Sequence, residues 1–123
     1  MQINESAENY LETILILIEQ RGQVRAIDIA NELGFTKPSV SVALKKLKEH
    51  EYIEVDESGN ITLKETGYQI ASQMYDRHKT ITNLLISAGV SKETAMVDAC
   101  KIEHILSEES YQCIKKYVNQ NNG

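Results

Sequence analysis

The fold is decided by residues 25–48, which read RAIDIANELGFTKPSVSVALKKLK. From Arg25 to Gly34, apolar residues recur at helical spacing and predict a short helix with the glycine at its C-terminal cap. After a turn at residues 35–36, Pro38 lies in the first turn of a second helix, where its missing N–H is harmless. Two short helices joined by a glycine-containing turn, with lysines on the second, are typical of a helix-turn-helix.

A β-hairpin is expected directly after these helices. Residues 52–55 and 61–63 are rich in β-formers, and a glycine-containing turn at residues 56–60 separates them. A hairpin in this place is the wing of a winged helix-turn-helix. The alternative is a small α+β hairpin that makes no contact with DNA.

The rest of the chain shows apolar residues at helical spacing. Four more helices are expected: one capped by Asn4 or Ser6 and ending near Gly22, one from a Thr66 cap to about Ala88, one from Ser91 to about Leu106, and one from a Ser107 cap through Tyr117. The predicted fold class is therefore mostly α with one β-hairpin. We expect a winged helix-turn-helix over residues 1–65 and a helical domain over residues 66–123.

Length and composition are those of a globular protein. The 123 residues are 41% hydrophobic, which suffices for one ordinary core or for a small domain with a helical appendage. The longest apolar run, residues 14–18, is too short to span a bilayer, and no basic segment typical of a signal peptide precedes it. Cys100 and Cys113 are too far apart along a helix for a disulfide. A cytoplasmic protein with reduced thiols is expected.

The charge distribution favours DNA binding although the net charge of −5 does not. Residues 35–48 hold four lysines and no acid. The candidates for contact with bases are Thr36, Pro38, Ser39 and Ser41, because hydroxyls serve either base and apolar groups contact the thymine methyl. The candidates for contact with phosphates are Arg25, Lys37, Lys45 and Lys46.

A metal site is suggested by Cys100, Glu103 and His104. On the predicted helix these positions are i, i+3 and i+4, so that a thiol, a carboxylate and an imidazole share one face. His78 lies on the apolar stripe of the long helix. The alternative is ordinary packing, with a buried cysteine, a surface charge and a core histidine.

The order of the elements, together with these residues, resembles the diphtheria-toxin repressor family, which includes the manganese transport regulators. The motifs that carry the resemblance are DIANEL at residues 28–33, TKPSVS at 36–41, LKETG at 63–67, and AC at 99–100 with EH at 103–104. The resemblance covers nearly the whole chain. It implies a winged helix-turn-helix followed by a helical metal-binding and dimerisation domain, without the SH3-like domain of the longer members.

The resemblance also implies a function, that of a homodimeric repressor of metal-uptake genes. Such a protein binds a divalent transition metal and then recognises palindromic operators. The family's ligands map to Glu12, His78, Cys100, Glu103 and His104. Asn9 is a further candidate, at a position where manganese members carry Asp and iron members carry Met.

The choice of metal depends on Cys100, which stands where manganese regulators have Glu and matches the iron type. A thiolate suits Fe²⁺ better than hard Mn²⁺, so Fe²⁺ is favoured, while the carboxylate oxygens keep Mn²⁺ open. One alternative function is a winged-helix regulator that senses a small organic ligand without metal. The others are a zinc enzyme, although no HExxH motif is present, and a protein-interaction module.

Overall fold

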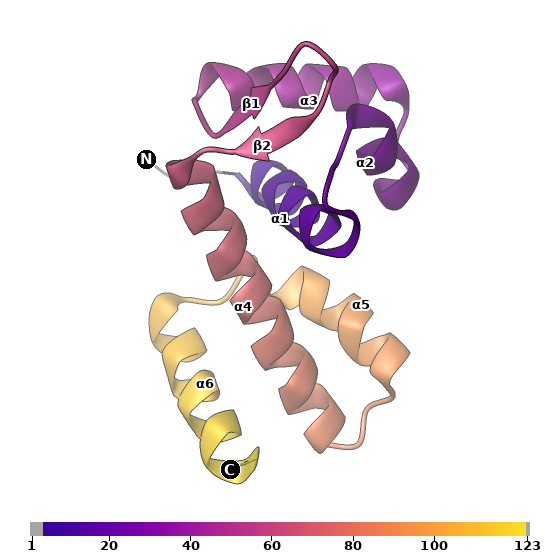
Figure 1. Ribbon diagram of the computed structural model, residues 1–123. Coiled ribbons are helices and arrows are strands. Elements are labelled where there is room, and N and C mark those ends of the chain that lie inside the picture. Colours follow the sequence, from indigo (N-terminus) through magenta and orange to yellow (C-terminus); the bar gives the residue numbers. More distant parts are fainter. Residues whose placement is uncertain (1–3, 123) are drawn as a thin grey trace. The chain divides into compact units, whose positions relative to one another are not determined.

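The computed structural model describes residues 4–122 and forms two compact units, the first ending at Gln73 and the second beginning at Met74. The elements are α1 (Glu5–Arg21), α2 (Ala26–Leu33), α3 (Lys37–Glu49), β1 (Ile53–Val55), β2 (Ile61–Leu63), α4 (Glu65–Ser87), α5 (Lys92–Ile102) and α6 (Glu108–Asn122) (Figure 1). The predicted class, mostly helical with one hairpin, is confirmed. The division falls inside α4, whereas the predicted functional boundary lies at the start of that helix.

In the first unit, α1, α2 and α3 pack against one another, and α1 and α3 also pack against the hairpin. Local signals set their ends as predicted. The Asn4 side chain accepts a hydrogen bond from the Ala7 N–H at 2.7 Å, and α1 ends where Gly22 adopts a left-handed φ of 81°. The most deeply buried side chains of this core are Leu11, Ile14, Leu17, Val24, Ile29, Val40 and Ile53. The helix-turn-helix prediction is confirmed, with α3 in the place of the recognition helix.

The hairpin is a short antiparallel pair in which Ile53 lies opposite Leu63 and Val55 opposite Ile61. In its turn, the Asp56 carboxylate accepts hydrogen bonds from the backbone N–H groups of Ser58 and Asn60, both at 2.9 Å. The Asn60 N–H is the main reason why the pKa of Asp56 lies below the usual aspartate value. The predicted wing is thus present and its turn is closed by one carboxylate.

The segment that leads into α4 is hydrogen-bonded to the residue just before β1. The carbonyl oxygen of Tyr52 accepts a hydrogen bond from the Lys64 N–H at 2.9 Å. Thr66 does not cap the helix, as the sequence suggested, because it lies inside the first turn and its hydroxyl donates to the Glu51 carbonyl at 3.2 Å. That prediction was wrong because a tertiary contact, rather than a cap, takes up the hydroxyl.

The second unit consists of the rest of α4 with α5 and α6. Its buried residues include Met74, Ile81, Ala95, Ala99, Tyr111 and Val118. Lys115 on α6 pairs with Asp76 on α4 at 2.9 Å. The Ser107 side chain accepts from the Ser110 N–H at 3.0 Å, which confirms it as a helix cap, and α6 continues beyond the predicted end to Asn122. By contrast, α5 stops at Ile102, short of the predicted Leu106.

Cys100 and Cys113 form no disulfide, and the first is half-buried while the second is exposed. Among the residues that the structure describes, no helix combines the length and apolar character needed to cross a membrane.

Candidate metal centre and nucleic-acid interface

The candidate metal ligands of the second unit gather where α5 ends. Cys100 lies in the last turn of α5, whereas Glu103 is the C-cap residue and His104 lies in the turn that follows. The expectation that all three lie on one regular helix was therefore wrong. The apolar spacing of the sequence predicts a helix as far as Leu106, but α5 ends at Ile102.

The Glu103 carboxylate is the centre of this group and is completely buried. One of its oxygens lies 3.1 Å from Nδ1 of His78, and the other lies 3.5 Å from Nε2 of His104. His78 comes from α4, so the fold brings together residues 25 positions apart in the chain. Within this unit, His78 and His104 thus both lie beside the Glu103 carboxylate, and their binding of a metal stays a prediction.

The side-chain types in this group are ones that bind divalent transition-metal ions. Imidazole nitrogen, carboxylate oxygen and the half-buried thiol of Cys100 are the donor types that such ions prefer. Suppose that two ligand atoms each lie about 2.1 Å from one ion and that the angle between them at the ion is a right angle or wider. The two atoms are then about 3 Å or more apart. The two separations at Glu103, 3.1 Å to His78 and 3.5 Å to His104, are of this size, and each involves a different oxygen of the carboxylate. A buried carboxylate is stabilised by hydrogen-bond donors or positive charge nearby, and a bound ion would be one source of such charge.

Glu12 and Asn9 lie on α1 in the first unit. Glu12 is among the buried residues of that helix. Asn9 is half-buried, and its backbone carbonyl accepts from the Thr13 hydroxyl at 2.8 Å. Their participation in the metal site stays a prediction.

The predicted DNA-contacting residues lie on one exposed side of α3. Thr36 caps the helix by accepting from the Ser39 N–H, and its hydroxyl donates to the Ser39 side chain at 2.9 Å. The opposite face of α3 buries Val40, Leu44 and Leu47. Lys37, Pro38, Ser39, Ser41, Lys45 and Lys46 are all exposed. The helix thus presents hydroxyls, an apolar ring and four of the chain's lysines to solvent.

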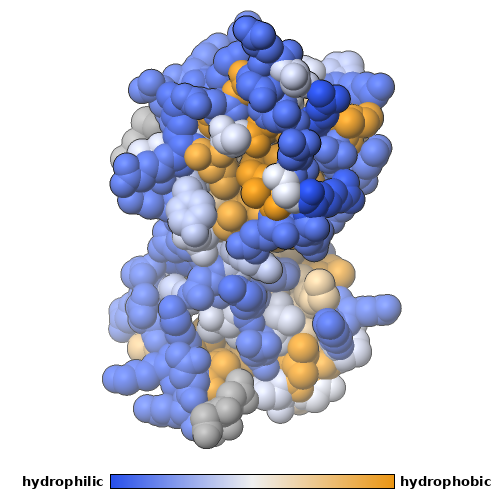
Figure 2. Space-filling view, viewed as in Figure 1, coloured by the Kyte–Doolittle hydropathy of each residue, from blue (hydrophilic) through white to orange (hydrophobic). Residues whose placement is uncertain are grey.

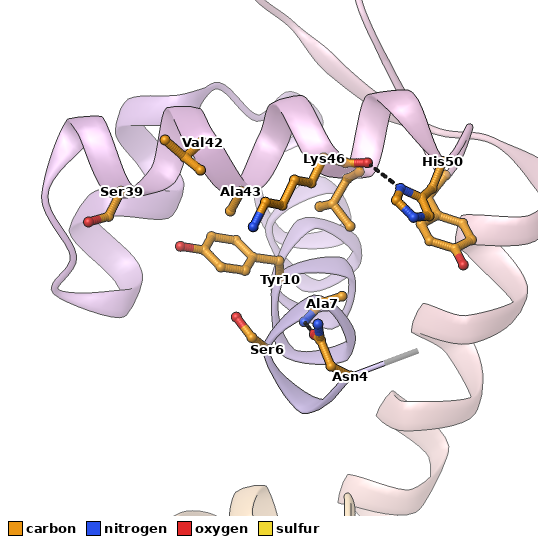
Figure 3. Close-up of a pocket in the computed structure, with 11 residues that line it drawn as sticks. Asn4, Ser6, Ala7, Tyr10, Ser39, Val42, Ala43, Lys46 and His50 are labelled. Carbon is orange, nitrogen blue, oxygen red and sulfur yellow. Dashed lines mark hydrogen bonds between the residues drawn. The ribbon is translucent and has the colours of Figure 1, made fainter. Parts of the chain in front are cut away.

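A cavity of about 410 Å³ lies beside this surface, between the first turns of α1 and the length of α3. Lys46 and Tyr10 extend into it, and the Nδ1–H of His50 donates to the Lys46 carbonyl at 2.9 Å on its far side (Figure 3). Burial raises the pKa of the Tyr10 hydroxyl above its ordinary value. No acidic residue lines the cavity, although the chain carries a net charge of −5.

Val42 is a surface residue that the sequence analysis did not select. It lies on α3 one turn after Ser39, lines the cavity and is 57% exposed. Its spacing could have identified it, because positions 39, 42 and 46 share a helix face and Val42 does not belong to the buried stripe.

Arg25 has a different environment from the lysines. It is the N-cap residue of α2, and its guanidinium donates a hydrogen bond to the Ser58 carbonyl in the wing turn. Its backbone N–H donates to the Asp28 carboxylate at 2.9 Å. Arg25 therefore ties the wing to the helix-turn-helix, and its contact with phosphate stays a prediction.

The second unit exposes large apolar side chains on α4, α5 and α6. Ile86, Met96, Val97, Ile105 and Tyr117 are between 41% and 78% exposed. Apolar patches set among hydrophilic side chains are visible in the space-filling view (Figure 2). Exposed apolar residues mark interfaces between protein chains where they form one large continuous patch.

Comparison with known proteins assigns a family domain to each half of the chain. Residues 2–60 match the family described as "Iron dependent repressor, N-terminal DNA binding domain". Residues 64–122 match "Iron dependent repressor, metal binding and dimerisation domain". Together the two matches cover nearly the whole chain.

Individual relatives are transcriptional regulators. The chain is 32% identical over 120 residues to the HTH-type transcriptional regulator MJ0568 of Methanocaldococcus jannaschii, covering 96% of each chain. It is 33% identical over 116 residues to the transcriptional regulator MntR of Escherichia coli O6:H1, covering 94% of this chain and 75% of that one.

Solved structures of similar fold include T. acidophilum IdeR, with a TM-score of 0.83, 27% identity and coverage of 97% of this chain and 55% of that one. The manganese regulator SloR has a TM-score of 0.81 and 26% identity, with the same coverage. The chain thus spans about half the length of these two solved proteins. The matched domains and relatives are those of regulators rather than enzymes, and the chain belongs to the iron-dependent repressor family of metal-dependent transcriptional regulators.

Proposed function

We propose that this protein is a homodimeric repressor that binds palindromic operators of metal-uptake genes when its metal site holds Fe²⁺ or, as the alternative, Mn²⁺. The observation that carries the proposal is the buried Glu103 carboxylate with imidazoles of His78 and His104 at 3.1 and 3.5 Å. Such a group, in a domain of a metal-binding family, is best explained as a set of ligands.

Each proposed ligand has a distinct role. Glu103 supplies negative charge between the two imidazoles. His78 and His104 supply neutral nitrogen donors, and Cys100 supplies a thiolate. Glu12 supplies a second carboxylate from the first unit, with Asn9 as a further oxygen donor. The ion, when bound, provides the positive charge that offsets these acidic groups.

The choice between the two metals depends on Cys100. A thiolate binds Fe²⁺ more readily than Mn²⁺, whereas Glu12, Glu103 and Asn9 offer oxygen atoms that suit Mn²⁺. Fe²⁺ is therefore proposed as the main effector.

Control of DNA binding follows from the distribution of the ligands over both units. Glu12 belongs to the unit that carries α3, and the other ligands belong to the unit with the dimerisation surface. An ion held by both sets would favour a spacing of about 34 Å between the recognition helices of a dimer, which matches successive major grooves. Without the ion, the carboxylates repel one another and other spacings become populated. Equal operator affinity with and without metal would contradict this mechanism.

The exposed side of α3 is proposed to enter the major groove. Thr36, Pro38, Ser39 and Ser41 contact bases, and Val42 adds an apolar group suited to a thymine methyl. Lys37, Lys45 and Lys46 contact phosphates, and Arg25 contributes charge beside the wing. The cavity beside Lys46, which has no acidic lining residue, is a suitable place for a backbone phosphate.

The first test is anaerobic fluorescence anisotropy on a duplex from the upstream region of the protein's own gene. Fe²⁺, Mn²⁺ and Zn²⁺ are titrated against a chelator control. Tight binding with Fe²⁺ alone supports the proposal, and an equal response to Mn²⁺ places Cys100 outside the set of ligands. If no metal alters binding to a duplex that the metal-free protein already holds, the metal switch is wrong and a regulator of the ligand-sensing type is favoured.

The second test compares two cysteine variants. Cys100→Ser is expected to weaken Fe²⁺ activation by at least tenfold, because the hydroxyl is a poor replacement for a thiolate. Cys113→Ser is the matched control, since that thiol is exposed on α6. If both variants respond to Fe²⁺ as the parent does, Cys100 is not a ligand.

The third test concerns the phosphate contacts. Lys45→Ala is expected to weaken binding to all duplexes alike and to reduce the salt dependence by about one unit of slope. Lys92→Ala is the control, because this exposed lysine lies on α5 in the other unit. A loss confined to one operator sequence would show instead that Lys45 reads a base.

A further inference from the structure

We propose that Arg77 is a positioning residue that holds the turn carrying Glu103 and His104 in the geometry that metal binding requires. This inference rests on the metal site proposed above. Arg77 has no place among the ligands, and its charge makes it an unexpected residue in the interior of the second unit, where its side chain is only 8% exposed.

The Arg77 guanidinium makes several contacts beyond its own helix. One terminal nitrogen donates to the carbonyl oxygens of Glu103 at 3.1 Å and of Leu106 at 2.8 Å. The other donates to the Glu108 carboxylate at 3.0 Å. The guanidinium carbon lies 4.9 Å from the centre of the Tyr111 ring. The planar, forked donor geometry of arginine allows all these contacts from one side chain.

These contacts matter because the ligands lie beyond the regular part of α5. The helix ends at Ile102, and the last carbonyls of a helix have no partners within it. Arg77 donates to the carbonyls of residues 103 and 106, which flank His104. A cation at a helix C-terminus is also favourable for the helix dipole. Arg77 thus supplies hydrogen bonds to the turn after α5, which carries the proposed ligands Glu103 and His104.

Arg77 also precedes the ligand His78 on α4. His78 contacts the Glu103 side chain, and Arg77 contacts the Glu103 backbone. The same turn of α4 therefore supplies one ligand and fixes the position of two others. A ligand whose backbone is held in place loses less conformational freedom on binding, so the clamp favours metal affinity as well as fold stability.

The competing explanation is that Arg77 only joins α4 to α6 through Glu108 and Tyr111. Lys115 provides a matched control for that role. It joins the same two helices through Asp76 at 2.9 Å and lies 5.7 Å from the same Tyr111 ring. None of its contacts within the described part of the chain involves residues 103–107.

The experiment compares Arg77→Met, Arg77→Lys and Lys115→Met with the parent protein. Metal affinity is measured by titration with Co²⁺, whose absorption bands report the geometry of its ligands. The metal-free proteins are compared by thermal unfolding and by hydrogen exchange of the amides of residues 103–107.

We expect Arg77→Met to weaken Co²⁺ binding by about 10–100-fold, the range typical of residues that orient metal ligands. We also expect altered absorption bands and faster exchange at residues 103–107. Arg77→Lys should fall between Arg77→Met and the parent, because lysine keeps the charge but not the fork. Lys115→Met should bind Co²⁺ within about twofold of the parent even where it lowers the melting temperature to a similar extent.

The proposal is overturned if both Arg77 variants bind Co²⁺ as tightly as the parent and show the parent's hydrogen exchange at residues 103–107. It is also overturned if Lys115→Met loses as much Co²⁺ affinity as the Arg77 variants. If Arg77→Met does not fold, the comparison of Arg77→Lys with Lys115→Met tests the proposal by the same criteria. Should the parent bind no Co²⁺ at all, the proposed metal site itself fails. The exchange of residues 103–107 then still shows whether Arg77 holds the turn.

Discussion

Gly67 lies where no other residue fits without movement of the backbone. A Cβ atom added there would lie 2.1 Å from the carbonyl oxygen of Tyr52. That oxygen accepts the Lys64 N–H, and this hydrogen bond joins the end of the wing to the start of α4. The glycine is therefore required by a close approach between two segments of backbone.

Gly67→Ala is expected to destabilise the protein by about 1–3 kcal/mol, the usual cost of forcing extra volume into a packed site. The helical preference of alanine acts in the opposite direction by about 1 kcal/mol. Urea unfolding followed by circular dichroism measures the net change. A variant more stable than the parent would mean that helix propensity outweighs the contact with Tyr52.

At the scale of the elements, the turn of the wing is held by hydrogen bonds to one titrating side chain, Asp56. Asp56 accepts backbone hydrogen bonds from Ser58 and Asn60, and the pKa of its carboxyl is lowered chiefly by the Asn60 N–H. The pKa of Asp56 is lower in the folded state than in the unfolded state. The hydrogen bonds to its carboxylate therefore stabilise the turn fully at any pH above the unfolded pKa. This stabilisation is lost as the pH falls through the folded pKa.

We therefore expect the wing turn to loosen only in acid, below the usual aspartate range. Amide NMR signals of residues 58–60 should titrate with a midpoint below the usual aspartate value. Asp56→Asn should remove this transition. A midpoint at or above the usual aspartate value would contradict the role of the hydrogen bonds.

For the whole molecule, metal binding should appear as added stability. A ligand that binds only the folded state at 100 times its dissociation constant stabilises that state by about 2.7 kcal/mol. Calorimetry with Fe²⁺ or Co²⁺ under anaerobic conditions is expected to show a higher melting temperature. Glu103→Gln keeps the shape of the central ligand without its charge and should largely abolish the rise. An equal rise in that variant would place the metal elsewhere.

Much of the fold could be predicted because its signals are local. The cap at Asn4, the left-handed glycine at position 22, Pro38 in the first turn of α3 and the turn before β2 each depend on a few neighbouring residues. The apolar spacing in α1 and α3 likewise identified the buried faces. The errors at Thr66 and at the end of α5 arose where a contact from a distant segment outweighed the local preference.

By itself the sequence determined the order of the elements, the helix-turn-helix with its wing, and the types of side chain that suit DNA and a transition metal. Only the tertiary structure placed His78 against Glu103 and gave Arg77 its contacts with the turn after α5. The physical reason is that periodicity and capping act over one or two helical turns. The pairing of α4 with the end of α5 joins residues 25 to 29 positions apart, and packing of the whole unit decides it.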